Sequence, residues 1–432
     1  MTDGPPVDDR DGLQHLPAAV IEKAAGPGRI RGIALDAWAD ARRAPRSAGR
    51  VLREGIRQAR ALHSRERRLV REALYGMVRG HVRWSFLLDT DEPTVLWVAQ
   101  LVGHGLPLEQ ARALAPAPYE RLFDGGKLDG LDPEARLAVW HGVPASVVQA
   151  VVAAWGLDEA RAFFEASDAR APVTLRANLA VVRDRDELAR RLEQEGVETV
   201  PGTLTSTSLH VVGRANLQAS KAFRDGAFEV QDEGSQRMAE HVPVVDRVWD
   251  VCAGAGGKAL ALAARGMEVL GTDVRRGALS EARRRAQRAR VRLRTQQLSP
   301  LGEVPDAVAA FAPNAVLVDA PCSGTGVLRR HPEHRWLLDP DALQELTQLQ
   351  GAILDRASGH VPVGGTLVYG TCSVLREENE GAVDAFLARH HDFQRVGEPM
   401  IVVPHRHGTD GFFAQSLSRS HPLQSTTGSS QR

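Results

Sequence analysis

Cysteine, lysine and long apolar runs are all scarce in this chain of 432 residues. Its three cysteines include no Cys-x-x-Cys pair, which argues against a disulfide scaffold and against a cysteine-rich zinc site. No apolar stretch approaches the roughly 18 to 20 residues of a membrane span. The acidic, proline-rich start lacks the basic and apolar regions of a signal peptide. We therefore expect a cytoplasmic protein with no membrane partner and no metal site.

Arginine supplies almost all of the positive charge, since only four of the 54 basic residues are lysine. A coding bias toward arginine, as in a GC-rich genome, is the explanation that we favour. It still leaves a surface rich in planar donors that suit phosphate. The 54 acidic residues balance the charge, and a hydrophobic content of 43% is ordinary for a globular protein. The length allows two or three domains, and since nothing in the sequence indicates an oligomer we favour a monomer.

Composition and periodicity divide the chain into five segments. Residues 1–45, rich in Gly, Pro, Asp and Arg, are expected to be flexible. Residues 46–150 have apolar residues at helical spacing and predict an all-helical domain. Residues 151–228 combine linker helices with short strands, which is typical of a small α+β module. Residues 229–417 alternate strands with helices and predict a mostly parallel sheet covered on both faces, and residues 418–432 are expected to form a disordered tail.

A glycine-rich turn at residues 253–257 follows a predicted strand and opens a helix. Backbone amides at such a helix N-terminus can approach a ligand closely. Asp273 ends the next strand, where a carboxylate can accept hydrogen bonds from both hydroxyls of a ribose. An aspartate that merely caps a helix is the alternative. Turn and acid together indicate an adenosine-containing cofactor, either a dinucleotide or S-adenosylmethionine.

Two of the three cysteines follow apolar strands. Residues 315–318 lead to Asp319 and Cys322, and residues 366–369 lead to Cys372. Because strand ends of open α/β sheets face the ligand crevice, we expect both thiols in one crevice beside a carboxylate. That combination favours covalent chemistry. The alternative is that each cysteine is a small buried apolar residue.

Three segments resemble the signature motifs of RNA 5-methylcytosine methyltransferases of the Nop/Sun family, in the bacterial Fmu/Sun (RsmB) branch. They are residues 250–258, 319–326 and 371–379. Further matches occur in family order across roughly residues 170 to 420, at 175–178, 230–236, 327–333 and 408–413. The resemblance implies a Rossmann-like methyltransferase domain, S-adenosyl-L-methionine as cofactor and RNA as partner.

The same resemblance implies a small RRM-like module before the catalytic domain and an all-helical, NusB-like RNA-binding domain before that. The NusB-like part rests on residues 66–79, for which a generic helical bundle is the alternative. The expected fold class is therefore α/β, with both smaller domains placed before the Rossmann-like one.

The resemblance also assigns roles to single residues. Cys372 would add to C6 of cytosine and so make C5 able to attack the sulfonium methyl. Cys322 would serve the later loss of the C5 proton and the release of the enzyme, and Asp319 would bind the N3/N4 edge of the base. Lys258 is expected to point into the site, with a surface contact as the alternative, and Cys252 is expected to be structural.

Further residues are expected to bind cofactor or RNA. The expected cofactor ligands are Asp250, Ala253, Gly254, Gly256, Gly257, Lys258, Asp273 and Asp319. The expected RNA ligands are Arg176, Asn178, Arg329, Arg330, His331 and Arg335. The arginine-rich segment 275–294 either follows RNA phosphates or forms a solvated helix face. Because cytosine must be unstacked to reach both thiols, a loop or single strand is favoured, most of all in small-subunit ribosomal RNA, with transfer RNA as the alternative.

Several positions depart from the family pattern. Ala255 replaces a usual proline, Ala259 a Thr or Ser, Ala278 an arginine, Gln297 or its neighbour Gln296 a third-strand aspartate, and Arg376 another proline. The missing aspartate normally contacts the adenine side of the cofactor, so these changes affect cofactor affinity more than chemistry. They motivate a second hypothesis, a non-catalytic RNA-binding or ribosome-assembly protein built on a degenerate methyltransferase.

Overall fold

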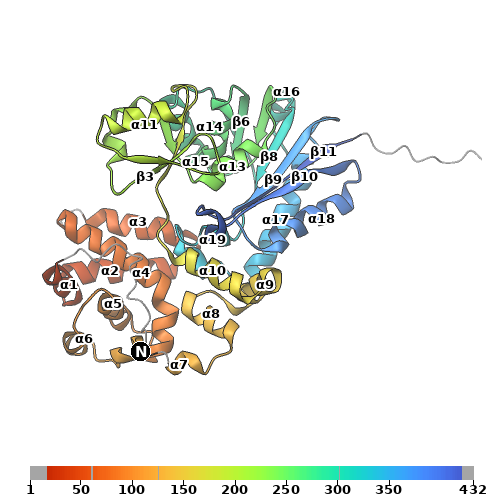
Figure 1. Cartoon of the computed structure of the whole chain (residues 1–432). Helices are drawn as coiled ribbons and strands as arrows, with labels where there is room; N and C mark the ends of the chain where they lie inside the picture. Colours follow the sequence, from red (N-terminus) through yellow and green to blue (C-terminus); the bar gives the residue numbers. More distant parts are fainter. Residues whose placement is uncertain (1–16, 60–61, 125, 301, 421–432) are drawn as a thin grey trace, which may run out of the picture. The chain divides into compact units, whose positions relative to one another are not determined.

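The computed structural model describes residues 17–59, 62–124, 126–300 and 302–420, which form two compact units (Figure 1). The first unit consists of the described part of Met1–Arg170 together with Val327–Ala342. The second consists of Ala171–Gly326 and the described part of Leu343–Arg432. None of the described helices is long and apolar enough to cross a membrane.

Apart from the inserted segment Val327–Ala342, the first unit is built from helices, and buried apolar residues between Ile21 and Tyr119 form one core. Its helices are α1 (Ala18–Ala25), α2 (Arg29–Arg43), α3 (Ala48–Gln58), α4 (Ser64–Leu88), α5 (Pro93–Val102), α6 (Leu108–Leu114), α7 (Gly126–Asp129), α8 (Pro133–His141), α9 (Ala145–Trp155) and α10 (Leu157–Asp168). The side chain of Trp97 on α5 is fully buried and donates a hydrogen bond to the carbonyl of Ala24 on α1. The structure thus contains the all-helical domain that the periodicity predicts.

The expected flexibility of residues 1–45 is not what the structure shows for residues 17–45, which fold as α1 and α2. Ile30, Ala34, Trp38 and Ala41 recur at helical spacing along α2 and are buried in the core of the first unit. The other faces of α2 are rich in Arg and Asp, so the amino-acid composition of the segment does not reveal its apolar stripe. Residues 1–16 lie outside the described residues.

The inserted segment follows the Cys322 loop directly in the chain but belongs to the first unit. Its short 3-10 helix η7 (Pro332–Leu337) carries Trp336, whose ring lies edge-on to Trp38 and His81 at centroid distances of 5.3 and 5.8 Å. The helices α9 and α10 also belong to this unit, which runs to Arg170. The division therefore differs from the expected boundary at residue 150, because helical periodicity does not reveal which core a helix joins.

The second unit begins with a small α+β module, as the sequence predicts. It contains β1 (Thr174–Ala177), α11 (Arg185–Glu193), β2 (Thr199–Pro201), β3 (Ser208–Val211), α12 (Lys221–Arg224) and β4 (Phe228–Val230). The strands form an antiparallel sheet in the order β2-β3-β1-β4. This βαββαβ succession is the ferredoxin-like arrangement.

The remainder of the second unit is a seven-stranded sheet with helices on both faces. Its elements are α13 (Glu233–His241), β5 (Arg247–Asp250), α14 (Gly257–Ala264), β6 (Glu268–Asp273), α15 (Arg276–Arg288), β7 (Arg294–Gln297), α16 (Asp306–Phe311), β8 (Ala315–Asp319), α17 (Pro340–Ser358), β9 (Thr366–Thr371), α18 (Glu380–Arg389), β10 (Phe393–Val402), α19 (Pro404–His407) and β11 (Phe412–Arg419). The strand order is β10-β11-β9-β8-β5-β6-β7. Strands β5 to β9 run parallel and β11 runs antiparallel to its neighbours β9 and β10.

The order of this sheet reverses at β5, which pairs with β6 on one side and with β8 on the other. Such a switch point opens a crevice at the carboxyl ends of the strands. Apolar side chains of α16, α17 and α18 pack on one face of the sheet, and Met238 of α13 lies against Gly370 of β9 on the other. The predicted Rossmann-like arrangement is confirmed. Of the expected tail, Ser418 and Arg419 complete β11, and residues 421–432 lie outside the described part of the chain.

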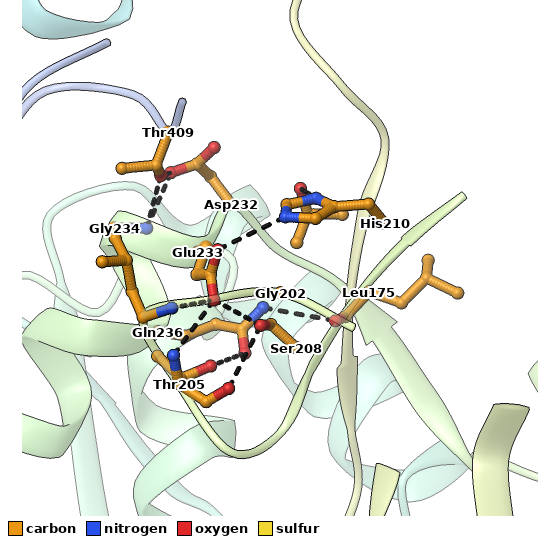
Figure 2. Close-up of polar contacts among 12 residues, drawn as sticks. Leu175, Gly202, Thr205, Ser208, His210, Asp232, Glu233, Gly234, Gln236 and Thr409 are labelled. Carbon is orange, nitrogen blue, oxygen red and sulfur yellow. Dashed lines mark hydrogen bonds and ion pairs between the residues drawn. The ribbon is translucent and has the colours of Figure 1, made fainter. Parts of the chain in front are cut away.

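A buried acid holds the small module against the sheet. Figure 2 shows Glu233, the first residue of α13, with its carboxylate aimed at the module. One carboxylate oxygen accepts hydrogen bonds from the backbone N–H groups of Leu204 and Thr205 and from the Ser208 hydroxyl. Burial raises the pKa of Glu233, but His210 and these donors outweigh burial and bring the pKa to about 2. The acid is therefore a permanently charged anchor.

Two more side chains complete this anchor (Figure 2). The amide of Gln236 accepts a hydrogen bond from the Thr205 hydroxyl and donates one to the carbonyl of Leu175. The Thr409 hydroxyl donates to Asp232, which joins the start of α13 to the loop before β11. Residues 230–236 and 408–413, two of the segments that resemble the family, thus meet at one place.

Candidate active site

The two cysteines that follow β8 and β9 lie side by side. The Sγ atoms of Cys322 and Cys372 are 3.3 Å apart. The strands are parallel neighbours, with Asp319 opposite Gly370, so both loops leave the same edge of the sheet. The N–H of Gly326 donates to the carbonyl of Cys372 at 2.9 Å and fixes the loops to one another. The structure therefore brings the predicted pair of thiols together.

The surroundings of Cys322 favour its protonated form. The hydrogen bond with Cys372 raises the pKa of Cys322 well above its usual value, and burial and the nearby charge of Glu378 raise it further. At neutral pH Cys322 is consequently a neutral thiol that can donate to the sulfur of Cys372. The arrangement can stabilise negative charge on Cys372.

A carboxylate and an ammonium group lie beside the thiols. Lys258 on α14 donates from Nζ to Oδ2 of Asp319 at 2.7 Å, and the Lys258 side chain is only 9% exposed. Burial lowers the pKa of Lys258, but Asp319 more than compensates, so the pKa is raised and the ammonium stays charged. The ammonium also lies 5.3 Å from the ring centroid of Phe412. Lys258 thus points into the site, as expected.

The glycine turn between β5 and α14 has the backbone geometry that a closely approached ligand requires. Gly254 and Gly256 have φ angles of 55° and 84°, which a side chain would strain. The N–H of Gly254 donates to Oδ2 of Asp273 at 2.9 Å. The other oxygen of Asp273 accepts from the backbone N–H and from Nε of Arg275. The turn and the acid that the sequence singled out are therefore in direct contact.

Asp250, at the end of β5, has a buried carboxyl group without a hydrogen-bond partner among the described residues. It is fully buried, and neither of its oxygens has a hydrogen-bond partner among the described residues. Burial and the nearby charge of Asp319 raise its pKa to about 8. An orphaned buried acid is expensive and generally marks a functional position. With the open turn and Asp273, it fits a polar cofactor with hydrogen-bond donors.

The departure at the end of β7 lies next to this site. Gln297 pairs in register with Asp273 of β6 and is exposed. Its amide donates to the carbonyl of Val274 at 3.0 Å. An amide therefore stands beside the acid of the turn, where the resemblance leads us to expect a second carboxylate.

Two expected RNA ligands are internal to the second unit. Arg176 is 4% exposed and donates from Nε to Gln231 at 2.7 Å, and burial lowers its pKa to about 10. Asn178 is 1% exposed and donates to the carbonyls of Gly226 and Ala289. In this structure both side chains are buried and join the module to its surroundings. The motif shows which residues recur, but not which of them face solvent.

The remaining expected RNA ligands belong to the first unit. Arg335 is fully buried and donates to Asp168 at 2.5 Å and to the carbonyl of His141 at 2.9 Å, which gives it a structural role as well. Arg329 is buried, whereas Arg330 and His331 are half-buried and keep a face toward solvent.

His331 also has a contact that the sequence did not predict. Together with Glu333 and His334 it forms, within the described residues, one cluster with the spacing of metal ligands.

Sequence reasoning missed the hydroxyl groups that connect the two thiol loops. The hydroxyl oxygens of Ser323 and Ser373 are 3.2 Å apart, and those of Thr325 and Ser373 are 3.0 Å apart. The N–H of Val374 donates to the Thr325 hydroxyl. All of these residues lie within the segments 319–326 and 371–379. Their membership of these two motifs was the feature of the sequence that could have identified them.

Comparison with known proteins supports the resemblance. Residues 242–418 match the family model described as 16S rRNA methyltransferase RsmB/F, and residues 143–218 match a model described as the RsmF/B-like ferredoxin-like domain. The ribosomal RNA small subunit methyltransferase B of Pectobacterium atrosepticum is 34% identical over 271 residues, which cover 60% of this chain and 62% of the relative. The chain thus matches less than two thirds of that relative's length.

Two further comparisons extend over most of the chain. The probable ribosomal RNA small subunit methyltransferase B of Bacillus subtilis is 27% identical over 90% of this chain and 98% of its own length. The crystal structure of PH0851 is similar in fold, with a TM-score of 0.70 at 23% identity over 94% of this chain and 99% of that one. On the strength of the two matching family models and these relatives, the chain belongs to the RsmB/F family, in its Sun/RsmB branch.

Proposed function

We propose that this protein transfers a methyl group from S-adenosyl-L-methionine to C5 of a cytosine in RNA, through a covalent bond between Cys372 and C6. The observation that carries the proposal is the pair of thiols, 3.3 Å apart, beside the Lys258 and Asp319 ion pair. Family membership supports methyl transfer to RNA. The names of the relatives support small-subunit ribosomal RNA as the substrate. We propose that the protein acts in the cytoplasm.

The two thiols divide the reaction between them. Cys372, which receives the hydrogen bond of its neighbour, attacks C6 as the thiolate, and the resulting enamine makes C5 nucleophilic. Once Cys372 is bound to carbon, its charge and hydrogen bond no longer raise the pKa of Cys322. Cys322 then loses its proton to solvent and takes the C5 proton after methyl transfer. The bond between Cys372 and C6 breaks, and Cys372 leaves as the thiolate.

Asp319 selects the base. Its carboxylate accepts a hydrogen bond from the exocyclic amino group of cytosine, a donor that uracil does not have at that position. The ammonium of Lys258, at 2.7 Å, orients this carboxylate and supplies the positive charge that makes the pair stable in a partly buried site. RNA must present the base unstacked, which favours a loop or a single strand.

The cofactor, when bound, supplies the electrophilic methyl group. Asp250, Ala253, Gly254, Gly256, Gly257 and Asp273 would hold it. The side chain of Arg275 contacts both oxygens of Asp273, but it is 71% exposed and can turn toward solvent. Asp273 would then accept hydrogen bonds from the ribose hydroxyls.

The helical unit is proposed to bind RNA as a NusB-like domain, and the protein is proposed to act as a monomer. The alternative is a non-catalytic RNA-binding or ribosome-assembly protein. Gln297 beside Asp273 favours that alternative, because an acid is missing from the adenine side of the site. Calorimetry with S-adenosylmethionine separates the two, because the alternative predicts no binding at any cofactor concentration.

The proposal is tested by bisulfite sequencing of RNA from a strain that lacks the gene. We expect one protected cytosine of the small-subunit RNA to be lost, and to be restored by the wild-type gene but not by Cys372→Ala. A protected cytosine lost from transfer RNA instead would move the substrate, and full restoration by Cys372→Ala would rule out the assigned nucleophile.

A further inference from the structure

A buried glutamate stands behind the loop that carries Cys322. Glu378 ends the short 3-10 helix η8 (Arg376–Glu378), six residues after Cys372, and is fully buried. Within the described residues its carboxylate forms no ion pair, so hydrogen bonds alone compensate its charge. Burying a carboxylate without a counter-ion costs folding free energy, so a function for Glu378 is expected.

Both oxygens of this carboxylate bind the residue next to the thiol. Oε1 accepts from the backbone N–H of Ser323 at 2.8 Å, and Oε2 accepts from the Ser323 hydroxyl at 2.5 Å. A carboxylate is the one common side chain that accepts at both atoms, so it fixes the backbone and the side chain of Ser323 together. The peptide that follows Cys322 is thereby held in one orientation.

A glutamine binds the residue that precedes Cys322. Gln350 of α17 is fully buried, and its Nε2 lies 3.0 Å from both the carbonyl of Pro321 and Oε1 of Glu378. The residues before and after Cys322 are therefore tied to the same pair of side chains. The Tyr369 hydroxyl donates to the carbonyl of Glu378 at 2.6 Å and anchors the glutamate to β9, the strand that leads to Cys372.

We propose that Glu378 is the positioning residue that sets Cys322 against Cys372, and so determines that Cys322 is the thiol that releases the product and not the one that attacks. The assignment of these two steps rests on the function proposed above. The hydrogen bonds between Glu378 and Ser323 do not depend on the proposed function. Glu378 also adds to the causes that raise the pKa of Cys322, after Cys372 and burial, so the same carboxylate favours the protonated thiol.

A glutamine cannot take over this role. Three donors converge on the Glu378 carboxylate, from Ser323 N, Ser323 Oγ and Gln350 Nε2. An amide offers one accepting oxygen and turns its NH2 group toward the remaining donor, so Glu378→Gln loses at least one bond and the negative charge. Glu377, the preceding residue, is exposed, and Glu377→Gln is therefore the matched control.

The first measurement needs no RNA. Each thiol is alkylated with iodoacetamide at a series of pH values, and peptide mass mapping gives the pH midpoint of reaction for Cys322 and Cys372 separately. We expect Glu378→Gln to shift the Cys322 midpoint to lower pH, because a negative charge that favours the protonated thiol is gone. Glu377→Gln should leave both midpoints in place. An unchanged Cys322 midpoint in a folded Glu378→Gln protein would overturn the positioning role, whatever the substrate is.

The second measurement follows turnover on the RNA substrate. Glu378→Gln should raise the fraction of enzyme trapped in covalent adduct by about tenfold, while the single-turnover rate of methyl transfer changes by less than about threefold. A purely structural role would instead lower both together with thermal stability. Absence of adduct and methylation in the wild-type protein would refute the proposed function and leave the alkylation result to decide on Glu378. If Glu378→Gln does not fold, Gln350→Met, which keeps the carboxylate but releases Pro321, must raise the adduct fraction in smaller measure without lowering the Cys322 midpoint, or the proposal fails.

Discussion

The thiol side and the cofactor side of this catalytic crevice are held together very differently. At the ends of β8 and β9, hydroxyls, backbone amides and the Glu378 carboxylate satisfy one another around the two cysteines. At the end of β5, both oxygens of Asp250 lack a partner, and an amide stands beside Asp273 at the end of β7. The thiol side is preorganised by the chain itself, whereas the cofactor side would be completed by the cofactor that we propose.

The largest effect is expected on the thiol side. Cys322→Ala removes the group that we propose takes the C5 proton, so we expect multiple turnover to fall by at least about 100-fold and a protein–RNA adduct to accumulate. Denaturing gel electrophoresis with labelled RNA detects this adduct. Cys252→Ser, which changes the third thiol, should accumulate none. A Cys322→Ala protein that turns over without adduct would remove the release role.

Lys258 joins the two sides, since it extends from the cofactor turn to Asp319. Lys258→Met keeps the length of the side chain but leaves the partly buried Asp319 without its counter-ion. We expect the single-turnover rate at saturating cofactor to fall by about 100-fold, because the carboxylate that we propose binds cytosine loses its orientation. Lys221→Met, which removes a lysine whose ion pair within the described residues is with Asp225 on the surface of the module, is the control. A fall of less than about threefold would show that Asp319 is oriented without Lys258.

On the cofactor side the expected effect is one of pH and stability. The pKa of Asp250 in the folded protein is raised from 3.8 to about 8, so the folded chain keeps a proton that the unfolded chain releases as the pH rises above about 4. The free energy of unfolding therefore decreases progressively from about pH 4 to about pH 8. Asp250→Asn should remove this decrease. We expect the variant to gain on the order of a few kcal/mol of unfolding free energy over wild type between pH 5 and pH 8 while binding cofactor more weakly.

Denaturant unfolding at both pH values measures this difference, with the exposed Asp246→Asn as the control. A stability difference that does not change with pH would mean that Asp250 is ionised and has a partner in solution. The contrast between the two sides of the crevice would then be smaller than the structure indicates.

The smallest effect concerns the departure at β7. Gln297→Asp places a carboxylate beside Asp273, where it can accept from the adenine side of the cofactor, although the two acids also repel one another. We expect cofactor affinity to rise by about fivefold, which corresponds to the net value of one hydrogen bond, about 1 kcal/mol. Calorimetry with S-adenosyl-L-methionine measures this affinity. The control is Gln296→Asp, whose side chain lies on the other face of the strand. Equal affinities for all three proteins would show that the glutamine is a neutral replacement.

Several errors of the sequence-based prediction have one cause. Residues 17–45 were expected to be flexible, yet the apolar stripe of α2 is buried. Arg176, Asn178 and Arg335 were expected to meet RNA, yet each is buried and bonded within its own unit. Residue type and motif membership do not record burial, which depends on which surfaces pack together.

The sequence by itself determined the order of the elements, the alternation that makes a parallel sheet, and the cysteines, acid and glycine turn at strand ends. These follow from local periodicity and from the rule that the ends of parallel strands share one edge. Only the tertiary structure decided that Glu378 and Gln350 hold the Cys322 loop, that Asp250 lacks a partner, and that Val327–Ala342 joins the helical unit. Each of these depends on contacts between residues far apart in the chain, which no spacing along the sequence encodes.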